Sequence, residues 1–238
     1  MAKGSGTTRT AKGGATATVS KGSIYDVEGG KEFVDEMKKL ASEYGLPIDI
    51  EIIPRDNGAF ADAHQPLDGR LVVGLHRVLG YQKEDKYGLP HNVGANNENV
   101  ATRMRAVAAH EFAHQLAQGY NWLPEQGMTW EQFKLDERKR GFKVAEAKQH
   151  YEGYLKRREQ ALLRRVPLEK HRKMLKQLNE VEKSYNSEKD GSKKLSNYAK
   201  NNGGSEFVAE AYAFARVYGK GKNPYADKVY SIINKYRK

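Results

Sequence analysis

Residues 99–118 read NVATRMRAVAAHEFAHQLAQ, a run that contains neither proline nor glycine. Its large apolar residues and one alanine recur at helical spacing, at Met104, Val107, Ala108, Phe112 and Leu116. This spacing predicts one amphipathic helix. An asparagine at 96, 97 or 99 can cap its start, and Gly119 follows its end. We therefore expect a helix over residues 99–118 that packs on the core along one face.

The same run contains His-Glu-Phe-Ala-His at residues 110–114. Histidines four apart lie on one face of a helix, one turn from each other, and Glu111 projects beside them. Two neutral imidazoles can bind Zn²⁺, and a carboxylate beside the metal can take a proton from water. The alternative is a helix whose two histidines are only solvated or hydrogen-bonded. The motif and its helical context favour a zinc site at His110 and His114.

A catalytic zinc site needs a third protein ligand and leaves its fourth position open for water. The pattern that adds a glycine and then a third histidine after the motif is excluded, because those positions hold Ala117 and Tyr120. Residues 203–215, GGSEFVAEAYAFA, instead predict a second helix, with Ser205 as its N-cap.

Glu206 and Glu210 are four residues apart and share one face of this second helix. Two carboxylates on an apolar helix are costly to bury unless they bind something. We interpret Glu206 as the third zinc ligand. Glu210 then accepts a hydrogen bond from a ligand imidazole and fixes its tautomer. The alternative is that both carboxylates lie on a solvated face.

HEFAH at 110–114, the upstream tyrosine of Leu195-Ser-Asn-Tyr198, and EFVAEAY at 206–212 together resemble the catalytic domain of anthrax lethal factor and its relatives. These are gluzincin-type zinc metallopeptidases, and they include proteins encoded by phages and mobile elements. The resemblance covers residues 99–118 and 196–218. It implies one Zn²⁺ held by His110, His114 and Glu206, with Glu111 as the catalytic base.

The resemblance also implies a tyrosine just before the second helix that stabilises the oxyanion. Tyr198 lies at that position, and Tyr212 and His91 stay open as alternatives. The implied activity is that of a zinc-dependent peptide-bond hydrolase, an endopeptidase acting on a protein or peptide. Two other functions remain: a non-catalytic basic phage structural or nucleic-acid-associated protein with a zincin-like fold, and a toxin or effector domain with the same chemistry.

The region before the motif predicts a helix over 28–43, a strand over 48–53, and two antiparallel strands, 59–63 and 70–75, joined by a turn at Asp68-Gly69. We expect an α+β fold in residues 24–238. Its compact zincin-like core would combine a small mixed sheet that has an edge strand, the metal-binding helix and the glutamate helix. His64, His76 and His91 are expected in loops or at the surface rather than as ligands.

Between the two motifs, residues 131–194 are charge-rich and helical in composition. Helical stretches at 145–165 and 168–185 are separated by Val166-Pro167. Leu155, Leu162 and Val166 on the first are expected to meet Leu168, Leu175, Leu178 and Val181 on the second. This predicts a helical-hairpin insertion carried on the catalytic core, with Trp122 and Trp130 packing the junction.

The chain has a net charge of +11, and the excess lies outside the two motifs. Residues 131–194 hold 19 Lys and Arg against 11 Asp and Glu, and residues 1–23 form a Gly/Ser/Thr-rich basic segment, expected to be a disordered tail. These parts suit nucleic acid or an acidic partner, although ordinary solvated helix faces explain them equally well.

The sequence has no cysteine, which leaves histidine and carboxylates as its strong zinc ligands. It has no signal-peptide pattern and no apolar stretch long enough to span a membrane. We expect a cytoplasmic protein, in a bacterial host cell or a phage particle, without a membrane partner.

Overall fold

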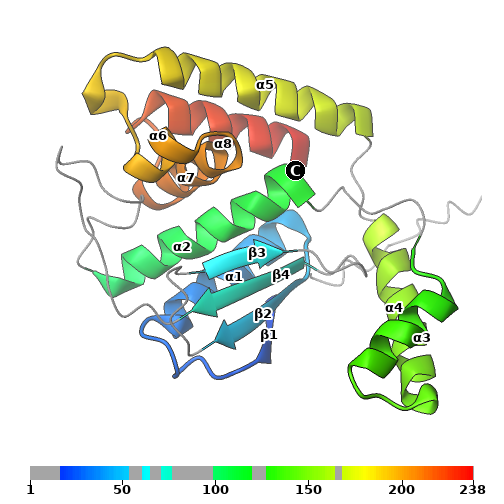
Figure 1. Cartoon of the computed structure of the whole chain (residues 1–238). Helices are drawn as coiled ribbons and strands as arrows, with labels where there is room; N and C mark the ends of the chain where they lie inside the picture. The colour runs from blue at the N-terminus through cyan, green and yellow to red at the C-terminus, as the bar shows by residue number, and fades with distance from the viewer. Residues whose placement is uncertain are drawn as a thin grey trace, which may run out of the picture.

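The computed structural model describes residues 17–53, 61–64, 71–76, 99–119, 127–163 and 168–237. Within them the chain has an α+β fold with eight α-helices and a four-stranded mixed sheet (Figure 1). The α+β class expected from the sequence is thereby confirmed.

The sheet has the strand order β1-β2-β4-β3. β1 (Ala17–Lys21), β2 (Ile48–Ile53) and β4 (Leu71–His76) run parallel, whereas β3 (Ala61–His64) pairs antiparallel with β4. Residues alternate between the two faces of a strand, so Ile48, Ile50 and Ile52 of β2 all point into the core. β3 is the last strand in the order, and α2 packs beside it (Figure 1).

One helix packs against two others in the core of the molecule. α2 (Val100–His114) packs against α1 (Gly30–Tyr44) and against α7 (Gly204–Tyr218). Alanines at 106, 108, 109 and 113 make much of the buried surface of α2, which lets neighbouring helices approach closely. Phe112, Leu116 and Phe207 are fully buried in the shared core. The predicted helix over 99–118 is confirmed for residues 100–114, and a π-helical turn (Gln115–Gly119) extends it.

Helices after the motif complete the core. α5 (Leu168–Ser187) packs against α8 (Pro224–Arg237) and α7, and a short 3-10 turn (Gly191–Lys193) leads from α5 to α6 (Asn197–Asn202), which packs against α7. Met174, Leu178 and Val181 of α5 belong to the main hydrophobic core.

The predicted hairpin of residues 145–165 with 168–185 is wrong. α4 (Val144–Leu163) instead packs against α3 (Trp130–Lys139), and Figure 1 shows this pair set apart from α5. Leu155, expected inside the hairpin, is 45% exposed. The α3–α4 hairpin has aromatic packing of its own, in which Trp130 and Phe133 contact Tyr151. Helical periodicity placed Leu178 and Val181 of α5 correctly on a buried face, but it gave neither the buried face of α4 nor the helix that covers α5.

Three smaller predictions are also corrected. Residues 17–21, assigned to the disordered tail, form β1, whose Ala17 is buried. The N-cap of α7 is Gly203 rather than Ser205, because the helix begins at Gly204. His76, expected in a loop or at the surface, is a buried residue of β4.

The helix predicted at 28–43 and the strands predicted at 48–53, 59–63 and 70–75 correspond to α1, β2, β3 and β4. Residues 1–16, the turn at Asp68-Gly69, His91, Trp122 and the Val166-Pro167 break lie outside the described residues. No helix in the described part of the chain combines the length and the apolar character needed to cross a membrane.

Candidate metal centre

Two packed helices contribute the residues of the HExxH motif and the downstream glutamate. His110 and His114 lie in the last two turns of α2, and Glu206 lies in the first turn of α7. Asn99 caps the start of α2, where its side chain accepts a hydrogen bond from the Thr102 amide at 3.3 Å. The contact between α2 and α7 thus brings together side chains that are 92 and 96 residues apart in sequence.

The three donor atoms form a nearly equilateral triangle. Glu206 Oε2 lies 3.1 Å from His110 Nε2 and 3.2 Å from His114 Nε2. The two Nε2 atoms are 3.1 Å apart. In the part of the chain that the structure describes, His110, His114 and Glu206 are the one group of this kind whose donor atoms converge.

The donor set fits zinc in both chemistry and spacing. Imidazole nitrogen and carboxylate oxygen are zinc ligands, and bonds of about 2.0–2.1 Å in a tetrahedron separate the ligand atoms by roughly 3.3 Å. The observed distances of 3.1–3.2 Å are close to that spacing. The side chains of all three residues are largely buried but not sealed off from solvent, with exposed fractions of 13–26%.

Glu210 holds His110 from the side opposite the triangle. His110 Nδ1 lies 2.8 Å from Glu210 Oε1. Because a carboxylate accepts, Nδ1 is the donor, which leaves Nε2 of the neutral ring with a lone pair facing Glu206 and His114. Glu210 is 1% exposed, and its second oxygen accepts a hydrogen bond from Ser196 Oγ at 2.6 Å. The structure therefore brings Glu210 to the place expected of a residue that orients a ligand imidazole.

Charge within the cluster shifts two pKa values in opposite directions. Burial lowers the pKa of His110, but hydrogen bonds to Glu206 and Glu210 outweigh this effect and raise it to about 10. Burial raises the pKa of Glu206, yet its hydrogen bonds to His110 and His114 bring it well below its ordinary value. In the metal-free protein the cluster therefore favours a protonated His110 beside an ionised Glu206.

Glu111 is 7% exposed and lies on α2 between the two histidines. Burial raises its pKa, the positive charges of His110 and His114 lower it, and the charges of Glu206 and Asp62 raise it further. The result is a carboxyl group whose pKa lies above its ordinary value beside the donor triangle. Such a group holds a proton more tightly than an ordinary glutamate does.

Tyr198 lies on α6 with its ring centroid 6.1 Å from that of His110. Burial raises the pKa of its hydroxyl, and the charges of Glu206, Glu111 and Glu210 raise it further. Tyr212, the alternative, is fully buried in α7, and its hydroxyl donates to Tyr44 at 3.0 Å. Of these two tyrosines, the structure brings only Tyr198 to the cluster.

Two supporting residues were missed by sequence reasoning. Gln115 Nε2 donates to the Val72 carbonyl at 3.1 Å, which ties the end of α2 to β4. Ser196, which hydrogen-bonds Glu210, is fully buried and caps α6. A serine three residues before Ala199 carries an N-cap signal, which could have located the start of α6 but not its contact with Glu210.

Comparison of the chain with protein-family models, with curated proteins and with solved structures gives no match.

Proposed function

We propose that this chain is a zinc-dependent peptide-bond hydrolase, an endopeptidase that uses one Zn²⁺ held by His110, His114 and Glu206. The observation that carries the proposal is the convergence of three donor atoms, 3.1–3.2 Å apart, from two helices distant in sequence. A buried glutamate, Glu111, lies beside them. A structural zinc site has no need of that carboxylate, whereas a hydrolytic one needs a base there.

When bound, zinc acidifies a water molecule and polarises the carbonyl group that is to be cleaved. Glu111 takes the proton from that water and later delivers it to the leaving amine. Its raised pKa suits the first of these steps, because a stronger base takes the proton from water more readily. Glu210 keeps His110 in the tautomer whose Nε2 faces the metal.

Tyr198 is proposed to donate a hydrogen bond to the negative charge that develops on the carbonyl oxygen of the substrate. Its raised pKa keeps the hydroxyl protonated and therefore able to donate. β3 is the last strand in the order of the sheet and lies beside α2, and such an edge strand can align an extended peptide. We interpret the sheet, α2 and α7 together as a zincin-like core.

The test of the proposal is metal-dependent cleavage of a peptide library, followed by Glu111→Gln. The variant is expected to keep one zinc per chain, measured by elemental mass spectrometry, and to lose about 10²–10⁴-fold in kcat/KM, since it lacks the proton acceptor. Glu131→Gln, on the exposed surface of α3, serves as the matched control and should leave both quantities unchanged. Full activity in Glu111→Gln would exclude this role for Glu111.

Tyr198→Phe tests the oxyanion donor separately. The expected loss is about 10–10³-fold in kcat with little change in KM or zinc content, because the hydrogen bond is needed mainly in the transition state. Tyr212→Phe is the control, as it removes a buried hydroxyl of α7 that contacts Tyr44 instead of the cluster. An equal loss of kcat in both variants would move the role away from Tyr198.

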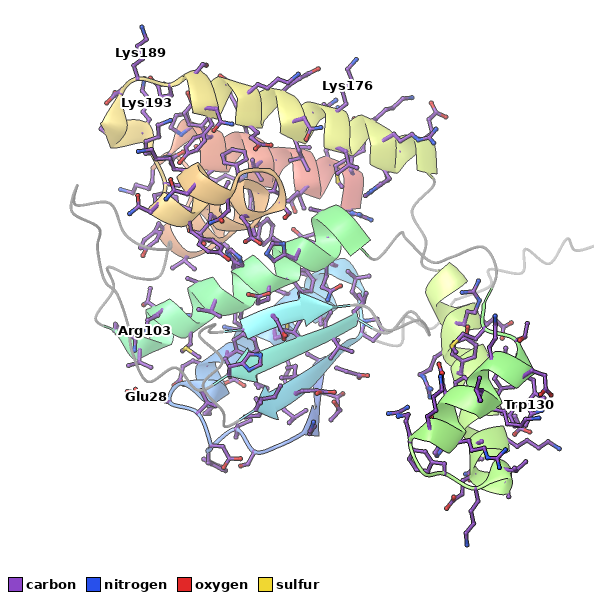
Figure 2. All side chains as sticks on the ribbon, in the orientation of Figure 1. Glu28, Arg103, Trp130, Lys176, Lys189 and Lys193 are labelled. Carbon is purple, nitrogen blue, oxygen red and sulfur yellow. The ribbon has the colours of Figure 1, made fainter. Side chains whose placement is uncertain are left out.

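A second function, binding of nucleic acid or an acidic protein, is favoured by the solvent-facing side of α5. Arg172, Lys176 and Lys183 are exposed and spaced four and seven residues apart, so they lie on one face of the helix. Figure 2 shows Lys176 projecting from α5, and Lys189 and Lys193 projecting near its end. These three cations, with the exposed Glu180 between Lys176 and Lys183, give this face a net positive charge that suits a polyanionic partner, as in the basic phage structural protein considered as the alternative. It is compatible with peptidase activity in the same chain.

A further inference from the structure

Ser196 is a buried residue that joins two parts of the candidate site. It precedes α6, the short helix that carries Tyr198, and none of its surface is exposed. α6 packs against α7, the helix that carries Glu206 and Glu210 (Figure 1). Ser196 therefore lies between the helix of the candidate oxyanion donor and the helix of the candidate ligand.

The hydroxyl of Ser196 makes two hydrogen bonds. Its Oγ accepts from the Ala199 amide at 3.1 Å, which is the N-cap bond of α6. The same Oγ lies 2.6 Å from Glu210 Oε2. Because an amide can only donate and a hydroxyl has one proton, that proton must go to Glu210. The directions of these two hydrogen bonds are thereby fixed.

These bonds continue to the metal ligand. Glu210 accepts from Ser196 on one oxygen and from His110 Nδ1 on the other, at 2.8 Å. The chain of contacts thus runs from the Nε2 of His110, through Glu210 and Ser196, to the first turn of α6. Tyr198 is the second residue of that helix.

We propose that Ser196 is a positioning residue that couples zinc binding at His110 to the ordering of α6, so that an occupied metal centre fixes the helix that carries Tyr198. The inference rests on the proposed zinc site and goes beyond it, since it makes Tyr198 responsive to the metal. If zinc binding strengthens the hydrogen bond between His110 and Glu210, it also holds Glu210 in the orientation in which its other oxygen accepts from Ser196. Coupling of this kind is reciprocal: if zinc binding orders α6, then an ordered α6 raises the affinity for zinc.

The experiment uses the full chain and measures zinc affinity by chelator competition together with hydrogen–deuterium exchange of residues 197–202. In the unmodified protein, zinc is expected to slow exchange at the Ala199 amide about tenfold. Ser196→Ala is expected to bind zinc about tenfold more weakly and to lose the zinc-dependent protection of α6. Ser196→Thr keeps the hydroxyl and should restore both properties.

Asn223→Ala is the matched control for lost stability. Asn223 is also a buried cap, since its Oδ1 accepts from the amides of Tyr225 and Ala226 at 3.0 and 3.1 Å. Its Nδ2 also donates, to the Lys193 carbonyl at 2.9 Å. Its loss should destabilise the protein without changing the zinc affinity or the response of α6. A merely structural role for Ser196 would make the two alanine variants behave alike and would overturn the coupling.

The unmodified chain alone can also overturn the proposal, whether or not Ser196→Ala folds. Zinc binding without any slowing of exchange in residues 197–202 contradicts the coupling and leaves the metal site intact. No zinc binding at all overturns the coupling and the metal site together. Zinc binding with protection of α6, but without cleavage of any peptide, supports the coupling and overturns only the peptidase.

Discussion

A histidine is hydrogen-bonded to a buried glutamate in two regions of this molecule, with different consequences. In the α3–α4 hairpin, His150 Nδ1 contacts Glu137 Oε2, and the other oxygen of Glu137 accepts from Arg140 at 2.8 Å. A guanidinium is always charged, so it neutralises Glu137 at any ordinary pH. The contacts are local, within 13 residues of sequence, and they tie α3 to the start of α4.

In the core, His110 makes the corresponding contact with Glu210 through Nδ1, but its other nitrogen faces His114 and Glu206. Nε2 of each imidazole and Oε2 of Glu206 converge on one place. Such an arrangement is stable when a proton or a metal ion supplies the positive charge. A His–Glu pair alone therefore does not indicate a metal site, whereas donor atoms that converge on an exchangeable cation do.

Removing the glutamate from each region gives the largest expected difference between them. Glu206→Ala should weaken zinc binding by on the order of a hundredfold or more, because it removes one of three protein ligands. Glu137→Ala should leave zinc binding unchanged and lower the free energy of unfolding by about 2 kcal/mol, since its partners Arg140 and His150 reach solvent. Elemental mass spectrometry and thermal unfolding measure the two effects.

The opposite results in these two variants would contradict the assignment of the metal site to His110, His114 and Glu206. Zinc retained at full stoichiometry in Glu206→Ala would show that the third ligand lies elsewhere, with Glu210 the next candidate. Zinc lost in Glu137→Ala would mean that the α3–α4 hairpin, rather than the contact of α2 with α7, contains the metal site.

The core site was largely predictable from sequence because its residues obey helical spacing. The separations of His110 from His114 and of Glu206 from Glu210 place each pair on one face, and apolar neighbours require those helices to be buried. The expectation that Glu210 would contact a ligand imidazole agrees with its bond to His110. Zinc itself stays a prediction.

Contacts between distant elements were not predictable in this way. The pattern of α5 identifies Leu178 and Val181 as part of a buried face, but it fits α4 as well as α8, and the structure pairs it with α8. β1 was hidden because Ala17–Lys21 has few large apolar residues and gains its stability from parallel pairing with β2. Ser196 could be recognised as a cap but not as a partner of Glu210, since that contact depends on how α6 packs against α7.

The pH dependence of zinc binding gives a smaller and graded contrast between the two regions. The folded-state pKa of His110, about 10, lies above its ordinary value of 6.5. Its charged form therefore stabilises the metal-free protein fully below pH 6.5, and this contribution is lost as the pH rises toward 10. Zinc competes with that proton, so the zinc affinity should rise by up to about tenfold per pH unit between pH 6.5 and 9. Chelator competition across this range measures the slope, and calorimetry in two buffers counts the released proton.

Glu137→Ala should leave the slope unchanged, because its partners lie in the hairpin. A zinc affinity that does not change with pH would mean that zinc displaces no proton from His110. The core site would then lack the exchangeable cation that distinguishes it from the α3–α4 hairpin.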